Sequence, residues 1–162
     1  MNVEKQHGGW VILLSFCVAL MLSIIPLPEW ITVWRPDWVA MVLVYWCIAF
    51  PVWVGIISGW IVGIMQDVLS DTLLGQHALS LCILAYVSIK LHHQLRIFPW
   101  WQQAFVVGGL IALTHLPNIW IRGALGHPHV GWSFFYPALT SILFWWWIFV
   151  ILRDLRRTYR IF

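Results

Sequence analysis

The sequence predicts an all-α, polytopic membrane protein with six transmembrane helices in a single integral membrane domain, residues 1–162. Its composition is the first indication, because 62% of the residues are hydrophobic and only 9% are charged, whereas soluble domains carry roughly 25% charged residues. The apolar residues form continuous runs, which favours helices over the alternating pattern of a β-barrel strand. At roughly 20 residues per span, the length allows roughly five to seven spans and no extramembrane domain.

Six apolar runs are separated by prolines, turns and polar loops. The predicted spans cover about 10–25, 38–50, 52–68, 77–91, 100–120 and 132–152. The first run ends at Pro26-Leu27-Pro28 without a small-residue cleavage site, so we interpret it as an uncleaved span rather than a signal peptide. A polar loop at 29–37 precedes the second run. Pro51 separates the second run from the third, because proline disrupts a helix interior.

The later spans are also bounded by polar segments. A turn with Asp71 and Gly75 follows the third run, and a basic loop at 92–99 is expected to follow the fourth. The fifth run is expected to be interrupted near Pro117, and a loop rich in glycine, histidine and proline leads to the sixth. A basic tail at 153–162 closes the chain. Its arginines are Arg153, Arg156, Arg157 and Arg160.

Basic residues near the span ends predict that both termini are cytoplasmic. Six spans place seven of the nine basic residues inside and only Arg35 and Arg122 outside. A rival arrangement fuses residues 38–66 into one span and gives five spans with the same asymmetry. The fused helix would be about 43 Å long against a hydrocarbon core of about 30 Å. Pro51 would also lie in its middle, so we favour a hairpin of two short spans.

Small residues recur at intervals of four on the first and third spans. Residues four apart share one helix face, so each span presents a small face that lets another helix approach closely. Such a face packs either within the bundle or against a transmembrane helix of a partner, and both interpretations stay open. The two faces consist of Ser15, Ala19 and Ser23 on the first span, and of Gly55, Gly59 and Gly63 on the third.

Asp67 continues the glycine face and is the single acidic residue within an apolar run. An acid inside a membrane is costly, which makes Asp67 a candidate functional residue. It is either an interfacial acid or a cap for the turn before Gly75, or else it pairs with a ligand or a neighbour. The possible partners within the bundle are Gln66, His77 and His115. A polar ligand pocket would be expected near Asp67, Asp71 and His77.

Catalysis and metal binding find little support in the residue pattern. Asp67 and Asp71 lie one helical turn apart, but no nucleophile or metal set accompanies them. The clusters His92-His93 and His127-Pro128-His129 lack cysteine or carboxylate support and belong to opposite membrane faces. We therefore expect no enzyme activity, no metal and no cofactor. Nucleic-acid binding is disfavoured because basic residues gather only in the tail. The tail either simply ends the last span, or it binds anionic headgroups or a cytoplasmic protein.

A series of short motifs follows the chain in a characteristic order and spacing. They are Gly9-Trp10-Val11-Ile12, Leu14-Ser15-Phe16, Pro26-Leu27-Pro28, Arg35-Pro36-Asp37-Trp38-Val39, Tyr45-Trp46, Gly59, Gly63, Asp67, Leu74-Gly75, Trp101-Gln102-Gln103-Ala104 and Trp145-Trp146-Trp147-Ile148-Phe149. Together they resemble the rod shape-determining protein MreD family, and the proteobacterial members in particular, over nearly the whole chain. Asp71 stands where the family pattern is expected to have glycine. The turn at Pro51-Val52-Trp53 lacks a basic residue that many members have.

This resemblance implies a multi-pass protein of the bacterial inner membrane that belongs to the cell-elongation machinery. Proteins of this family act as non-enzymatic scaffolds that bind the bitopic protein MreC and support lateral peptidoglycan synthesis. The same assembly, the elongasome, includes actin-like MreB, the RodA glycosyltransferase and a penicillin-binding transpeptidase. The family fold is similar to the S components of energy-coupling-factor transporters. A small-molecule or lipid-binding membrane protein of that kind is therefore the alternative function.

Overall fold

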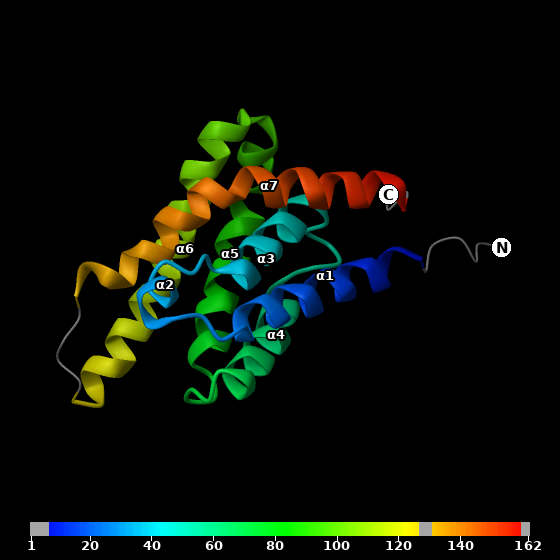
Figure 1. Cartoon of the computed structure of the whole chain (residues 1–162). Helices are drawn as coiled ribbons and strands as arrows, with labels where there is room; N and C mark the ends of the chain where they lie inside the picture. The colour runs from blue at the N-terminus through cyan, green and yellow to red at the C-terminus, as the bar shows by residue number, and fades with distance from the viewer. Residues whose placement is uncertain (1–6, 127–130, 160–162) are drawn as a thin grey trace.

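The structure is a computed structural model that describes residues 7–126 and 131–159. These residues form seven α-helices and a short 3-10 helix, and the chain is all-helical as predicted (Figure 1). The elements are α1 (His7–Ile24), α2 (Glu29–Thr32), α3 (Trp38–Ala49), α4 (Ile56–Leu69), α5 (Gln76–Ile97), α6 (Trp100–Ala124), η2 (Trp132–Phe135) and α7 (Tyr136–Thr158).

The long helices run back and forth between two ends of the molecule. One end gathers the last residues of α3, α5 and α7 with the first residues of α6. The other end gathers the start of α5, the end of α6 and η2. The start of α1 lies on the side of the molecule where α7 ends (Figure 1). Consecutive helices therefore alternate in direction.

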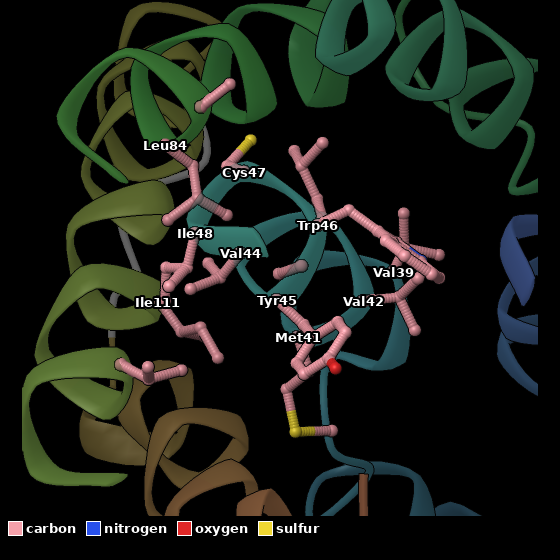
Figure 2. Packing of buried hydrophobic residues seen from close by; sticks show 14 of the residues in the cluster. Val39, Met41, Val42, Val44, Tyr45, Trp46, Cys47, Ile48, Leu84 and Ile111 are labelled. Atoms are coloured by element: carbon pink, nitrogen blue, oxygen red, sulfur yellow. The ribbon is translucent and has the colours of Figure 1, made fainter. Parts of the chain in front are cut away.

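Helix α3 forms the centre of the fold. Every residue from Val39 to Ala49 is buried, because α3 packs against α1, α5, α6 and α7. Figure 2 shows its side chains projecting around the helix axis, with Leu84 of α5 and Ile111 of α6 beside them. A helix that is hydrophobic on all sides is a buried helix. At 12 residues, α3 is about 18 Å long, and protein rather than lipid surrounds it.

The segment between α1 and α3 satisfies the ends of both helices. The Arg35 guanidinium donates to two backbone carbonyls at the end of α1, one of them that of Ser23. The Asp37 carboxylate caps α3 by accepting from the N–H of Ala40 at 3.2 Å. The Asp37 N–H donates to Ser141 Oγ on α7 at 3.1 Å. Helix ends leave such groups without intrahelical partners, so Arg35, Asp37 and Ser141 together join three helices.

Two separate helices, α3 and α4, flank the turn at Pro51. Phe50 has φ −136° and ψ 70°, outside the helical region, because a proline disfavours helical geometry in the preceding residue. Arg96 of α5 satisfies the last carbonyls of α3. It donates through Nε to Ile48 O at 2.9 Å and through Nη2 to Ala49 O at 2.7 Å. The structure therefore has two helices here, where the five-span alternative assumes a single helix through Pro51.

Two helices continue beyond their predicted ends. Helix α5 reaches Ile97 and includes most of the segment expected to be a basic loop, because polar residues there are compatible with a helix and Pro99 comes only after it. Helix α6 passes through Pro117 to Ala124 without the expected interruption. Proline removes only one backbone hydrogen bond. Because this 25-residue helix packs on α5 and α7, it stays helical through Pro117.

The remaining boundaries differ by a few residues. The predicted loop at 29–37 contains the one-turn helix α2. The predicted sixth span begins with η2, and α7 then extends to Thr158, into the predicted tail. Arg160 and the histidine cluster of 127–129 lie outside the described residues.

The outer surface carries many large apolar side chains. Ile57, Phe105 and Leu143 are each more than half exposed, as suits a surface in contact with membrane lipid. Among the described residues, α5, α6 and α7 are long and apolar enough to cross a membrane. The apolar part of α1, Gly9–Ile24, and helices α3 and α4 are shorter apolar helices.

Candidate functional site

Asp67 lies near the end of α4, with its carboxylate buried against the start of α5. One oxygen accepts hydrogen bonds from the backbone N–H groups of Gly75 at 2.8 Å and Ala78 at 3.4 Å. The other oxygen accepts from the N–H of His77 at 2.9 Å. These donors lie at the first turn of α5, where N–H groups lack intrahelical partners. Asp67 therefore performs for α5 the role of an N-cap side chain, from a different helix.

Two side chains complete the surroundings of this carboxylate. The Thr72 hydroxyl donates to Asp67 Oδ1 at 3.0 Å, and His77 Nδ1 lies 2.8 Å from the same oxygen. Of the three possible partners, His77 is thus the one in contact. The hydrogen bonds and the helix N-terminus offset the cost of burying a carboxylate. Since its own chain occupies both oxygens, the geometry gives Asp67 a structural role at the α4–α5 turn.

Asp71 does not join this cluster. Its side chain is exposed on the same turn, and its φ is +51°. Glycine adopts this left-handed conformation at no steric cost, and aspartate tolerates it. This left-handed conformation explains why the family pattern is expected to have glycine at position 71. Of the predicted pocket residues, the structure therefore brings Asp67 and His77 together and leaves Asp71 on the surface.

The glycine face of α4 packs on α5 of the same chain. A Cβ at Gly63 would lie 2.3 Å from Cα of Ala78, and one at Gly59 would lie 2.9 Å from the carbonyl oxygen of Leu81. A side chain at either position would force the helices apart, which is the role of small residues between membrane helices. At Gly55 a Cβ would meet only one side-chain carbon, at 3.6 Å. Gly59 and Gly63 thus serve internal packing.

The small face of α1 packs on α3. Ser15 Oγ accepts a hydrogen bond from Trp46 Nε1 at 2.8 Å, and Ala19 is buried beside it. Ser23 donates to the carbonyl oxygen of Ala19 at 3.0 Å. A small residue at position 15 therefore leaves room for the indole of α3.

Ser15 and Ala19 also line an apolar groove of about 290 Å³ between α1 and α7, which we call the α1–α7 groove. Val18 contributes to its α1 side and Ile151 to its α7 side, and α3 contributes Val42. Val18 and Ile151 are about half exposed. Ser15 and Ala19 themselves are buried, so the larger apolar residues form the accessible part of the groove.

His77 also lines a polar cavity of about 460 Å³, here called the His77 cavity. Its walls include Gln76, His115, Asn118 and Arg122, from the start of α5 and the end of α6. His115 Nε2 is buried with no hydrogen-bond partner among the described residues. Sequence reasoning missed Gln76 and Asn118. The spacing of His115, Asn118 and Arg122 by three and four residues could have indicated a polar face on α6.

The predicted tail arginines lie on a helix. Arg153, Arg156 and Arg157 belong to the last turns of α7. Arg153 lies 5.9 Å from the centre of the Phe149 ring, and its Nε is 3.6 Å from the Asp154 carboxylate.

No group of three histidine, cysteine, aspartate or glutamate residues within 7–126 and 131–159 is placed to hold a metal ion. The predicted pair His92 and His93 lies on α5 with ring centres 3.9 Å apart.

The fold and these sites define an all-helical protein with an apolar exterior, whose buried polar side chains largely join its own helices. Residues 4–155 match the family described as rod shape-determining protein MreD. The chain is also 31% identical over 149 residues to the rod shape-determining protein MreD of Haemophilus influenzae, covering 91% of this chain and 92% of that protein. No solved structure matches. The chain therefore belongs to the MreD family of shape-determining proteins, which confirms the resemblance indicated by its motifs.

Proposed function

We propose that this chain is a non-enzymatic scaffold of the bacterial inner membrane that binds MreC and supports lateral peptidoglycan synthesis. Membership of the MreD family over nearly the whole chain is the observation that carries the role in rod shape. The apolar exterior and the long apolar helices support a membrane location. MreB, RodA and a penicillin-binding transpeptidase are the other proposed members of the assembly.

We also propose six membrane passes with both termini in the cytoplasm. The alternating directions of α1, α3, α4, α5, α6 and α7 support this number. We count α3 as a membrane pass because it runs in the opposite direction to α1 and α4, although protein rather than lipid surrounds it. The end of α3, the α5–α6 connection and the end of α7 share one side of the molecule, and the basic residues on that side support its cytoplasmic placement.

The α1–α7 groove is the proposed docking site for the transmembrane helix of MreC. Its lining is apolar, and Val18 and Ile151 are about half exposed there, so an apolar helix can pack against them. A bitopic partner supplies one apolar helix, which suits a groove between two helices. The glycine face of α4 is a poorer site, because α5 already covers Gly59 and Gly63.

Depletion of the protein from a rod-shaped bacterium tests the scaffold role. Depleted cells are expected to become spheres, and a wild-type copy is expected to restore rods. MreC is expected to be recovered with the protein from detergent extracts. Cells that stay rod-shaped after depletion but lose uptake of one nutrient would overturn the proposal.

The alternative function, binding of a small molecule or lipid in the manner of an S component, is favoured by the His77 cavity. That cavity offers His115 Nε2 as a buried group without a partner and Asn118 as a polar wall residue. Mass spectrometry of the purified protein is the test. A molecule bound to the wild type and absent from an Asn118→Leu variant would support this function, and no bound molecule in either would count against it.

A further inference from the structure

A third cavity, of about 500 Å³, lies at the end of the molecule opposite the His77 cavity. It forms where α3, α5 and α7 end and α6 begins, so four helices contribute to its walls. It shares no lining residue with the α1–α7 groove or with the His77 cavity. We call it the arginine cavity, because Arg96, Arg153 and Arg156 line it.

The charge of the arginine cavity is positive. None of its described lining residues is acidic, and the nearest acid to Arg153, Asp154, has a largely exposed side chain 3.6 Å from Arg153 Nε. Arg96 is held in place by its bonds to two carbonyls at the end of α3, which use two of its five donors. Arg156 forms no hydrogen bond or ion pair among the described residues, so the cavity has unused donors for an anion.

A buried hydroxyl in the same cavity also lacks a partner. Tyr45 is only 4% exposed and lines the cavity, and its Oη has no hydrogen-bond partner among the described residues. An unsatisfied buried polar group is costly. Gln103, buried beside it, is already engaged, since it donates to Leu95 O at 3.3 Å and accepts from Trp145 Nε1 at 3.4 Å. The Tyr45 hydroxyl is therefore available to donate a hydrogen bond to a ligand in the cavity.

Apolar residues complete the lining, namely Ile48, Ala49 and three aromatic side chains. Phe98, Trp100 and Phe149 line the cavity, and Trp100 is about half exposed at the first residue of α6. Tryptophan at the end of a membrane helix lies at the level of the lipid headgroups. Arginines and aromatic residues that line one cavity at headgroup level suit an amphiphile with an anionic group better than a wholly polar solute.

We propose that the arginine cavity binds a phosphate group, with Arg96, Arg153 and Arg156 as cationic donors and Tyr45 as a hydroxyl donor. Guanidinium groups match phosphate oxygens in geometry and charge. The phosphate belongs either to the headgroup of an anionic phospholipid or to a water-soluble phosphate compound. On the six-pass arrangement the cavity faces the cytoplasmic leaflet, where anionic lipids attract basic segments. The membrane side of the cavity rests on the proposed function, whereas its lining residues are separate from those of the α1–α7 groove.

Native mass spectrometry of the full chain with added phosphatidylglycerol or phosphatidylcholine tests the site. One phosphatidylglycerol molecule is expected to stay bound at activation energies that remove phosphatidylcholine. The Arg156→Gln variant is expected to weaken retention roughly tenfold or more, as for a lost charge-assisted bond. The Tyr45→Phe variant, which keeps the ring, is expected to weaken it about threefold to tenfold.

Arg157→Gln is the matched control, because it removes the same charge from the neighbouring residue, which is exposed and does not line the cavity. It is expected to bind phosphatidylglycerol as the wild type does. Displacement of the lipid by millimolar inorganic phosphate would identify a soluble phosphate compound as the ligand, and retention would identify the lipid. Equal losses in Arg156→Gln and Arg157→Gln would overturn the proposal. Equal retention of both lipids by the wild type, with no effect of added inorganic phosphate, would also overturn it.

Discussion

At the residue scale, Asp67 joins α4 to α5 through hydrogen bonds to both of its carboxylate oxygens. An Asp67→Asn substitution keeps the shape but places an amide N–H₂ against groups that donate. We expect it to lower the free energy of unfolding by about 1–3 kcal/mol, measured by thermal unfolding in detergent. Asp71→Asn is the control, because Asp71 is exposed, and it is expected to unfold as the wild type does. Equal stability of the Asp67→Asn variant would contradict the capping role.

The two left-handed residues of the same turn predict effects of opposite sign. Asp71→Gly relieves a positive φ of 51° and is expected to stabilise the protein by up to about 1 kcal/mol. Gly75→Ala imposes a side chain at a φ of 100° and is expected to destabilise it by about 1–2 kcal/mol. The measurement is again thermal unfolding. A stabilised Gly75→Ala variant would show that the turn rearranges.

From the sequence, Asp67 could either cap the turn before Gly75 or bind a ligand, because both roles require an acidic residue beside a turn. What separates them is the direction of the N–H groups of Gly75, His77 and Ala78, which depends on how α5 begins. Arg96 is a similar case. Its position in a basic segment suggested a loop, whereas its carbonyl partners come from α3, remote in sequence.

At the scale of elements, the α4–α5 pair depends on the absence of side chains at two positions. Gly63→Ala brings a Cβ to within 2.3 Å of the Ala78 backbone and is expected to cost about 1–3 kcal/mol, as overpacked interiors do. Gly109→Ala on α6 meets nothing within 4 Å and is expected to gain about 0.5–1 kcal/mol, because alanine favours a helix. Thermal unfolding of the two variants provides the measurement, and equal shifts would contradict the close packing.

The existence of the long helices could be predicted from apolar runs, but not the burial of α3. Helix α3 is hydrophobic on all sides, but a helix that faces lipid on one side is also hydrophobic on all sides. The periodicity of the sequence therefore cannot distinguish a buried helix from a lipid-facing one. Its burial depends on α1, α5, α6 and α7 surrounding it. Likewise, α5 extends to Ile97 because the helix continues beyond its apolar part, which a search for apolar runs does not detect.

At the scale of the whole molecule, the alternating helices predict the side of the membrane reached by each turn. Reporter fusions at residue 5, after Pro51 and at residue 162 are all expected to report a cytoplasmic location. A fusion after Gly75 at the opposite end is expected to report a periplasmic location. A periplasmic signal at residue 5 would contradict the six-pass arrangement.

On the proposed function, this chain is a scaffold that holds MreC in the α1–α7 groove. The most direct test is the amount of MreC recovered with the protein from detergent extracts. Val18→Trp fills the groove and is expected to abolish recovery. Leu13→Trp is the control because Leu13 is 66% exposed on α1 and does not line the groove; it is expected to recover MreC as the wild type does. Undiminished recovery with a folded Val18→Trp variant would contradict the claim.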